Sequence, residues 1–299
     1  MTRIALFQST TGIEPAANAK RLVSAIGEAA AGGAAMLFTP EMSGLLDRDS
    51  KRASAQISEE ADDAVLAACR SAAREHAIWV HLGSLAVRSA DGKIANRAFV
   101  IDDKGEIRAR YDKIHLFDVD LPSGESWRES AVYSAGEGAV VVDQTPVGKL
   151  GLTICYDLRF PALFERLAEA GAEVIAIPAA FTVPTGNAHW HVLMRARAIE
   201  AGLFVVAAAQ VGQHEDGRTT FGHSLVVDPW GEILLDMGDQ PGVGFGDIDL
   251  SQPMTGLSRG PGRRTSSGDA FDVRYALARR APRPGQCRRR SKASCRERV

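Results

Sequence analysis

The stretch KLGLTICYDLRFPALFERLAEAGAEVIAIPAAFT, from Lys149 to Thr182, decides the fold class of this chain. It opens with a short apolar strand pattern that runs into Cys155, and a helical pattern follows at about 162–170, where Gly171 ends it. The apolar run EVIAIP then has the composition of a fully buried strand. Strand, helix and buried strand in this order predict an α/β protein.

The same alternation extends outward from this stretch. Toward the N-terminus, the strand patterns RIALFQST, AMLFTPE and AIWVHLGSLAV are separated by helical patterns at 14–34 and 58–76. Two hairpin patterns follow, NRAFVIDDKGEIRARYDKIHLF and AVVVDQTPVGKLGLTIC. A helix at 188–201, the strand LFVVAAAQ and a third hairpin, HSLVVDPWGEILLDM, complete the order. Hairpins within such an alternation predict a mixed sheet.

The composition predicts one globular domain with a basic tail. The chain has 299 residues, of which 45% are hydrophobic and 24% charged, as in ordinary globular proteins. Residues 259–299 hold 13 of the 35 Lys and Arg but 3 of the 37 Asp and Glu, so 22 basic and 34 acidic groups remain in 1–258. We expect a domain at 1–250 whose acidic character disfavours nucleic-acid binding. Residues 251–299, rich in Arg, Pro, Gly and Ser, are expected to be poorly ordered, either solvated or binding polyanions.

The cysteines and the N-terminus predict a cytoplasmic protein. Cys69, Cys155, Cys287 and Cys295 have neither the spacing of a secreted disulfide scaffold nor the CxxC pairs of a zinc site. The N-terminal MTRIALFQST has an apolar segment too short for a signal peptide, and no run reaches the roughly 18 apolar residues of a membrane span.

Polar or reactive residues follow three of the strand patterns directly. MLFTPE ends at Glu41, RARYDK at Lys113 and LGLTIC at Cys155. Side chains at the carboxyl ends of strands point into the crevice where α/β proteins bind ligands, so we expect the three to meet in one pocket. A nearby cation lowers the pKa of a thiol, and a carboxylate beside it accepts its proton. Cys155 is therefore a candidate nucleophile and Glu41 a candidate base. Lys113, with a backbone N–H near Tyr156, is a candidate donor to an oxyanion.

Each of these residues also has an ordinary structural explanation. Free cysteine is among the most buried residue types, so Cys155 suits a core position. Glu41, which follows Thr-Pro, suits a strand end, and Lys113 suits the surface. Taken singly, none of the three identifies an enzyme.

At these three positions the local sequences resemble the nitrilase superfamily of carbon–nitrogen hydrolases. FTPEMSG, YDKIHLFDVD and LTICYDLRFPALFERLAEAGAEVIAIPAAFT are similar to its three motifs: a Glu in a Pro-Glu turn, a Lys in KxHLF and a Cys in CYDxRFP. The similarity extends through ESAVYSAGE, GNAHWHVLMRARAIEAGLFVVAAAQVG and GHSLVVDPWGEIL, and so covers residues 1 to about 250.

The resemblance implies an α/β fold of the nitrilase type, a four-layer α-β-β-α sandwich that usually forms a homodimer through its helical layers. It also implies chemistry without a metal or an organic cofactor. Glu41, Lys113 and Cys155 take the roles of base, oxyanion donor and nucleophile, and Glu129 in RESAVYS matches a supporting glutamate. The implied reaction converts a small amide into an acid and ammonia through a thioester.

The residues after the cysteine narrow the branch. Tyr156 and Asp157 resemble the Nit branch of amidases, which includes deaminated glutathione amidases and omega-amidases acting on 2-oxo amides, whereas nitrile-cleaving members carry Trp and Glu there. Substrates of the Nit branch carry carboxylates, which suit a guanidinium. Arg159 is our candidate for that contact, and Arg195 and Arg197 are the alternatives.

Two further points on the pocket stay open in the sequence. An ion pair between Arg159 and Asp157 would give this arginine a structural role instead. Phe181 and Thr182, just after AIPAA, are candidates to line the substrate pocket.

The sequence leaves other functions open. A Cys–His hydrolase would need an imidazole at the thiol, from His115, His189, His191 or His223. HWH is a weak metal motif, because His189 and His191 lie on opposite sides of a helix and Asp or Glu partners at ligand spacing are lacking. A non-catalytic scaffold with this fold, or a nitrile-hydrolysing enzyme, would carry the same three residues.

Overall fold

The computed structural model describes residues 1–89, 92–120 and 126–251. They belong to one compact unit, Met1–Ser266; the other unit, Ser267–Val299, lies outside the described residues. The tail predicted at 251–299 also lies outside them, apart from Ser251.

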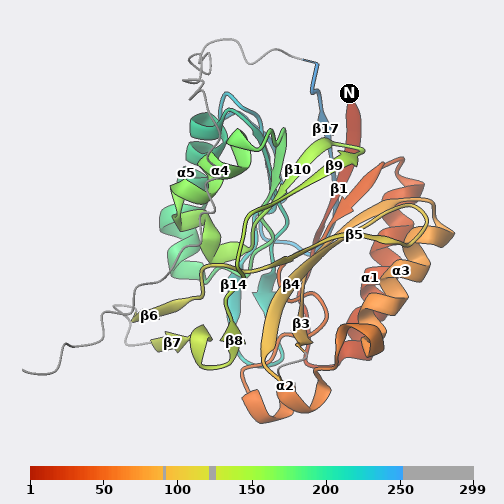
Figure 1. The fold of residues 1–299 in the computed structure, drawn as a ribbon, viewed down its shortest axis with the longest axis vertical. Coiled ribbons are helices and arrows are strands. Elements are labelled where there is room, and N and C mark those ends of the chain that lie inside the picture. The colour runs from red at the N-terminus through yellow and green to blue at the C-terminus, as the bar shows by residue number, and fades with distance from the viewer. Residues whose placement is uncertain (90–91, 121–125, 252–299) are drawn as a thin grey trace, which may run out of the picture. The chain divides into compact units, whose positions relative to one another are not determined.

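The first sheet has the strand order β17-β1-β2-β3-β4-β5, with β8 beside β4 (Figure 1). Strands β1, β2 and β3 are parallel, and the other neighbours on this path are antiparallel. The bounds are β1 (Thr2–Gln8), β2 (Met36–Phe38), β3 (Trp79–Arg88), β4 (Ile94–Ile101), β5 (Ile107–Asp112), β8 (Tyr133–Ser134) and β17 (Gly242–Ile248).

The second sheet has the strand order β16-β15-β12-β11-β10-β9. Its central strands β10, β11 and β12 are parallel, and antiparallel strands flank them, so both sheets are mixed as expected. The bounds are β9 (Val140–Thr145), β10 (Gly148–Leu152), β11 (Val174–Ala176), β12 (Phe204–Ala207), β15 (Leu225–Val227) and β16 (Ile233–Asp236). Two small hairpins stand apart, β6 (Asp118–Asp120) with β7 (Ser126–Arg128) and β13 (Val211–Gln213) with β14 (Thr219–Phe221).

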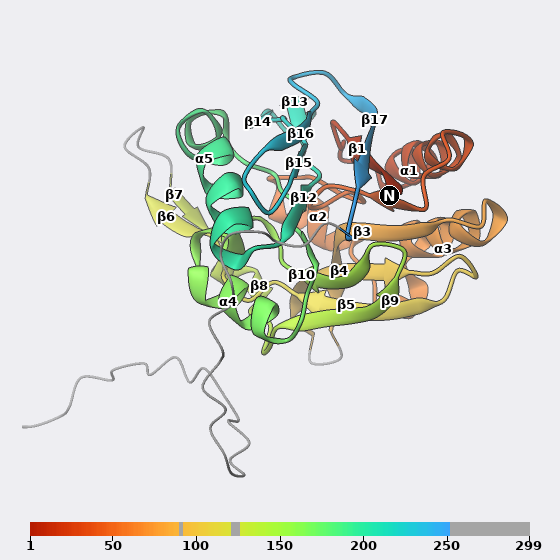
Figure 2. The same cartoon turned by 90° about the horizontal axis from the view of Figure 1, so that it is seen from above.

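Helices cover the outer faces of the two sheets. Figure 2 shows α1 (Pro15–Ala31) and α3 (Ala64–Glu75) on one side, and α4 (Pro161–Glu169) and α5 (Val183–Ala201) on the other. The short α2 (Ser50–Gln56) and the 3-10 turns η1 (Glu60–Asp62), η2 (Glu129–Ala131) and η3 (Cys155–Arg159) lie in the connections. The four-layer α-β-β-α sandwich is therefore confirmed. No helix in the described ranges is long and apolar enough to cross a membrane.

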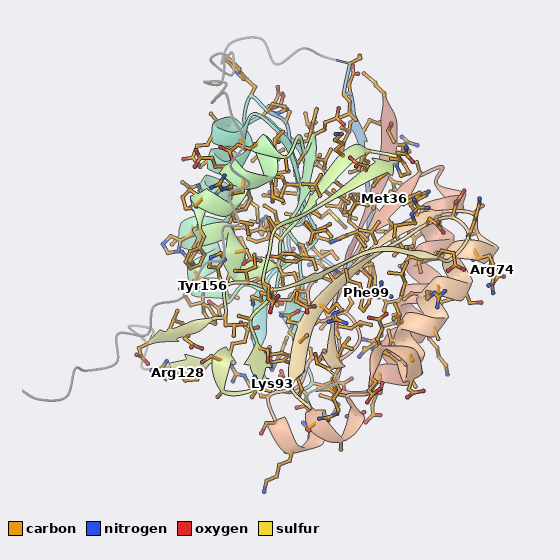
Figure 3. All side chains as sticks on the ribbon, viewed as in Figure 1. Met36, Arg74, Lys93, Phe99, Arg128 and Tyr156 are labelled. Atoms are coloured by element: carbon orange, nitrogen blue, oxygen red, sulfur yellow. The ribbon has the colours of Figure 1, made fainter. Side chains whose placement is uncertain are left out.

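The strand alternation divides the core between these layers. On β1, Ile4 and Leu6 belong to the cluster that fills the space between the sheets, whereas Ala5 packs in the cluster with α1 and α3. Met36 on β2 and Phe99 on β4 illustrate the same division (Figure 3). The apolar faces buried between these layers hold the layers together. Each Å² of apolar surface removed from water contributes roughly 25 cal/mol of stabilising free energy.

Two helix starts differ from the sequence prediction. The helix expected from Ser58 begins at Ala64, because the Asp63 side chain caps it by accepting the Leu66 N–H (2.8 Å). The helix expected from about 188 begins at Val183, since a proline in the first turn blocks no intrahelical hydrogen bond.

Several elements were not predicted, among them α2, the β6–β7 and β13–β14 hairpins, β8 and β17. Strand β17 has the sequence GVGFGDI, whose glycines lower its β propensity, yet it pairs with β1 along seven residues. The pairing of β17 with β1 therefore outweighs the low β propensity of its glycines.

Candidate active site

Three strand ends from the two sheets converge on one cavity. Glu41 follows β2 and Lys113 follows β5 in the first sheet, while Cys155 follows β10 in the second. The cavity has a volume of about 790 Å³, within the usual size of small-molecule sites. All the residues predicted for the site line it, namely Glu41, Lys113, Glu129, Cys155, Tyr156, Arg159, Phe181 and Thr182.

The two sheets meet closely at Gly83 of β3. A Cβ on this glycine would lie 2.0 Å from the Thr39 carbonyl oxygen and 2.6 Å from the Pro178 Cβ. Thr39 leads into Glu41, and the Pro178 carbonyl accepts the Cys155 N–H at 2.8 Å. Glycine therefore allows the approach that brings the two segments together.

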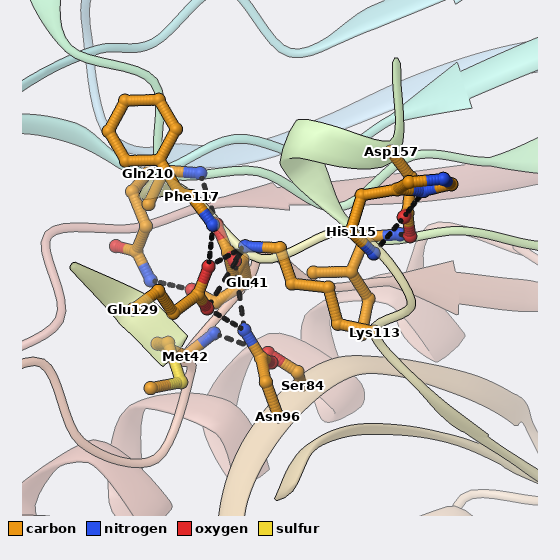
Figure 4. A network of polar contacts seen from close by, with 12 residues as sticks. Glu41, Met42, Ser84, Asn96, Lys113, His115, Phe117, Glu129, Asp157 and Gln210 are labelled. Carbon is orange, nitrogen blue, oxygen red and sulfur yellow. Dashed lines mark hydrogen bonds and ion pairs between the residues drawn. The ribbon is translucent and has the colours of Figure 1, made fainter. Parts of the chain in front are cut away.

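The Glu41 carboxylate is held by three nitrogen donors (Figure 4). Its Oε1 accepts from Lys113 Nζ (2.9 Å) and Asn96 Nδ2 (3.0 Å), and its Oε2 accepts from the Ala180 N–H (3.0 Å). Gln210 Nε2 donates to the Glu41 carbonyl at 2.9 Å and so fixes its backbone. The carboxylate is oriented and almost fully buried.

Lys113 lies between two carboxylates and is 3% exposed. Its Nζ is 2.9 Å from Glu41 Oε1 and 2.9 Å from Glu129 Oε2, and the Phe117 N–H also donates to Glu129 (2.6 Å). Burial disfavours the ammonium, but the charges of Glu129 and Glu41 outweigh it and hold the pKa of Lys113 well above its ordinary value. Lys113 is therefore a permanent cation and hydrogen-bond donor.

Cys155 begins η3 with φ +48°, in the left-handed region that non-glycine residues rarely adopt. Such strain persists where the surroundings impose it, and it is common at functional sites. Tyr156 follows at the start of η3, where backbone N–H groups have no partner within the helix and suit an oxyanion.

The thiol of Cys155 is protonated at rest, which corrects the expectation of a thiol pKa lowered by the cation. Burial raises its pKa well above the ordinary value, and the charge of Glu41, with which the thiol also hydrogen-bonds, adds to this. Lys113 acts in the opposite direction but is already balanced by Glu41 and Glu129. A thiolate would bring a third negative charge to one cation, so reaction requires proton transfer from the thiol to a base.

Asp157 ties the lysine segment to the cysteine turn. Its fully buried carboxylate accepts from the Tyr111 hydroxyl (2.6 Å), the Ile154 N–H (2.9 Å) and the His115 N–H (3.0 Å), and it lies 2.7 Å from His115 Nδ1. These bonds connect β5 and the segment after Lys113 with η3. Asp157 therefore holds the relative position of the two proposed reactive segments.

Arg159 is the arginine of the three candidates that reaches the cavity. It bonds to His189 Nδ1 (3.2 Å) and lies over the rings of Tyr156 and Phe181, without a carboxylate partner among the described residues. The suggested ion pair with Asp157 is absent from this part of the chain, because Asp157 is occupied as described above.

The other two arginines serve the protein itself. Arg195 donates to the Gly231 carbonyl (2.7 Å), and buried Arg197 bonds to the Leu158 carbonyl and pairs with Glu200. Neither lines the cavity.

The histidines do not supply a base to the thiol. Of the described residues that line the cavity, none is a histidine. His115 pairs with Asp157 and stacks on Phe160, and His189 pairs with Arg159. His191 and His223 both contact Asp236, outside the cavity. The geometry therefore does not favour a Cys–His hydrolase, and no His-rich metal set lies in the cavity.

Two residues of the site, Asn96 and Gln210, were not predicted from the sequence. Asn96 contacts both Glu41 and Glu129, and Gln210 supports Glu41 from a distant part of the chain. A polar Asn inside the apolar strand pattern IANRAFVI was a signal for the first. Gln210, at the end of VVAAAQ, repeats the pattern of a polar residue after a strand.

Comparisons with known proteins agree with this geometry. The carbon-nitrogen hydrolase family matches residues 3–253. A deaminated glutathione amidase of Yersinia enterocolitica is 50% identical over 168 residues, which are 55% of this chain and 58% of that protein, less than two thirds of its length. The deaminated glutathione amidase of Rattus norvegicus is 40% identical over 251 residues, covering 83% of this chain and 76% of the relative.

A solved amidase structure is also similar to this chain. It is a variant of the amidase from Nesterenkonia sp. AN1 that shows Michael addition of acrylamide at the active-site cysteine. It superposes with a TM-score of 0.73 at 30% identity, covering 84% of this chain and 96% of that one. The chain therefore belongs to the carbon–nitrogen hydrolase family, in the Nit-type amidase branch of the nitrilase superfamily.

Proposed function

We propose that this protein is a cysteine-dependent amidase that hydrolyses a small carboxylate-bearing amide, of the deaminated glutathione or 2-oxo amide type. The observation that carries the proposal is the convergence of Glu41, Lys113 and Cys155 in one cavity, with Arg159 free of a carboxylate partner within the described residues. The names of the relatives supply the deaminated glutathione type, and the resemblance of the sequence to the Nit branch supplies the 2-oxo amide type.

In the proposed acylation step, the Cys155 sulfur attacks the amide carbon as its proton passes to Glu41. Lys113 and the Tyr156 N–H donate to the oxyanion, where one such donor contributes roughly 2.7–4 kcal/mol to barrier lowering. Because Lys113 keeps its proton, Glu41 is the group that protonates the leaving nitrogen. A primary amide releases ammonia, and a peptide such as deaminated glutathione releases an amine.

In the proposed deacylation step, Glu41 takes a proton from water, and the hydroxide attacks the thioester carbonyl. The carboxylic acid leaves, and the proton returns to the Cys155 sulfur. Glu129 positions Lys113 throughout, and Arg159 binds the substrate carboxylate with Phe181 and Thr182 beside it. This cycle uses no metal or organic cofactor.

A substrate panel tests the activity. It contains a 2-oxo-dicarboxylate amide, deaminated glutathione, neutral amides and a nitrile, and mass spectrometry follows the acid formed from each. We expect turnover of a carboxylate-bearing amide and its loss in Cys155→Ala. Turnover of the nitrile alone would contradict the amidase, and no turnover of any compound would favour a scaffold.

The substrate carboxylate is tested with a matched pair of arginine variants. Arg159→Gln should raise KM for the carboxylate amide by roughly 10- to 100-fold, because a hydrogen bond to a charged group contributes about 1.5–3 kcal/mol. Arg166→Gln removes a surface arginine paired with Glu169 and should leave KM unchanged. An equal effect of both variants would contradict the role of Arg159.

We also propose a cytoplasmic homodimer whose catalytic domain is residues 1–250. Exposed apolar side chains gather on α5 and the nearby β15–β16 hairpin, at Val192 (68% exposed), Ile199 (37%), Trp230 (72%) and Leu234 (43%). A helical-layer interface would cover them. Sedimentation should show a dimer that Val192→Glu dissociates; a monomeric native protein would contradict this.

A further inference from the structure

A second cluster of reactive side chains lies outside the cavity. His191 of α5, His223 of the β14–β15 turn and Asp236 of β16 come from three elements. His191 Nε2 is 2.9 Å from Asp236 Oδ2, and His223 Nδ1 is 2.9 Å from Asp236 Oδ1. All three potential ligand atoms lie within 4.8 Å of one another, and none of these residues lines the proposed active site.

The backbone and ring of His223 are held in place by their neighbours. Its φ is +54°, its N–H donates to the Gly238 carbonyl (2.7 Å), and its carbonyl accepts from Trp190 Nε1 (2.7 Å). The imidazole stacks on Phe221, with ring centroids 4.5 Å apart and planes 24° from parallel. The ring nitrogen therefore faces Asp236 in a defined orientation.

The carboxylate of Asp236 is also oriented by the protein. The Gly238 N–H donates to its Oδ1 at 2.9 Å, besides the two imidazole contacts. Such outer hydrogen bonds fix metal-binding carboxylates in known sites. In the single chain the side chains of His191, His223 and Asp236 are 33%, 28% and 32% exposed, so an ion in solution can reach them there.

We propose that His191, His223 and Asp236 form a binding site for a divalent transition-metal ion of the Zn²⁺ class. Two imidazoles with one carboxylate are the donor set that suits such ions. Metal–ligand bonds of about 2.0–2.2 Å would replace the two imidazole–carboxylate hydrogen bonds, with a water completing the coordination.

This site goes beyond the proposed amidase function and takes no part in its chemistry. Its position joins α5 to the β15–β16 edge of the second sheet, so a bound ion cross-links the helical layer to that sheet. Binding then stabilises the native state by mass action, because the unfolded chain does not hold the three ligands together.

The test is a Zn²⁺ titration of the tag-free, chelator-treated full chain by calorimetry. We expect one saturable site per chain, weakened at least about tenfold in His191→Gln and in Asp236→Asn. His189→Gln is the matched control, because this neighbour on α5 contacts Arg159 instead and should leave Zn²⁺ affinity unchanged. An absence of saturable binding to the native chain would overturn the proposal.

Two further measurements separate this site from the thiol of Cys155 and from a folding defect. Bound Co²⁺ should give visible absorption without a thiolate charge-transfer band; binding that shows this band and disappears in Cys155→Ala would overturn the proposal. Zn²⁺ should raise the melting temperature of the native chain and of His189→Gln, but not of His191→Gln. An equal rise in all three would equally overturn it.

Discussion

Two clusters in this molecule place one cation between two carboxylates, and they differ in burial. In the cavity, Lys113 is 3% exposed and lies 2.9 Å from both Glu41 and Glu129. The three groups are held in one geometry with little water around them.

The other of these two clusters, around Arg97, is on the surface. Arg97, 20% exposed, pairs with Asp112 through two bonds (2.6 and 2.9 Å) and with Glu60 at 3.0 Å. Arg110 also pairs with Glu60 at 2.6 Å, so this carboxylate keeps a partner if Arg97 is removed.

The presence of ion pairs alone therefore does not reveal what a charge cluster does. Solvated ion pairs contribute about 0–1 kcal/mol each, and they tolerate change. Buried ions lose hydration, so their pairing often adds no net stability, but breaking it is costly. A cluster such as that of Lys113 is better explained by the chemistry it performs than by the stability it provides.

Among variants of these two clusters, Lys113→Met should have the largest effect. Activity should fall by roughly 10²–10³-fold from loss of the oxyanion donor alone. The free energy of unfolding should fall by about 3–5 kcal/mol, because Glu41 and Glu129 remain buried without their cation. Steady-state kinetics and urea unfolding measure the two effects.

A double variant separates the two causes. Lys113→Met with Glu129→Gln removes one uncompensated charge and should recover part of the stability while activity stays low. Full activity in either variant would show that the lysine does not stabilise the transition state.

An intermediate effect is expected at His81, a buried histidine between the sheets. Neither of its ring nitrogens has a hydrogen-bond partner among the residues that the structure describes, and burial lowers its pKa from about 6.5 to about 3. The unfolded chain therefore binds a proton below about pH 6.5 that the folded chain excludes until about pH 3. Stability is lost as the pH falls through this window, by about 2 kcal/mol at pH 5.

The free energy of unfolding at pH 7 and pH 5 tests whether burial of His81 causes this loss of stability. His81→Leu should lose less stability than the native chain on acidification. His76→Leu, which removes an exposed histidine, should leave the acid sensitivity unchanged. Equal acid sensitivity in all three proteins would refute the assignment to His81.

The smallest effect belongs to Arg97→Met. It should cost about 1 kcal/mol of stability and change kcat/KM by less than about twofold, since the ion pairs are partly solvated. A loss of activity close to that of Lys113→Met would contradict the distinction between the two clusters.

Much of the fold was predictable because it follows local patterns. The initial alternation, the three predicted hairpins and the helix after Cys155 depend on spacing within short windows, and each is present. Helix starts were less predictable: Asp63 caps α3 with its own side chain, and Gly186 near the start of α5 accommodates Phe221, whose Cγ would lie 2.1 Å from an added Cβ. These details depend on contacts that the local pattern does not contain.

The proposed site divides in the same way. Glu41, Lys113 and Cys155 were visible because each ends a strand, and strand ends converge in this class of fold. Asn96 and Gln210 join them through contacts across 55 and 169 residues of sequence, which no local spacing encodes. The raised pKa of the Cys155 thiol was also missed, because it depends on burial and on the total charge of the assembled cluster.

The most direct test of the proposed mechanism measures the mass of the peptide containing Cys155 after rapid acid quench of a reaction with a carboxylate-bearing amide. An acyl group should be present on the Cys155 sulfur during turnover, and no such adduct should form in Cys155→Ala. Turnover without any acylation of Cys155, or turnover that persists in Cys155→Ala, would contradict it.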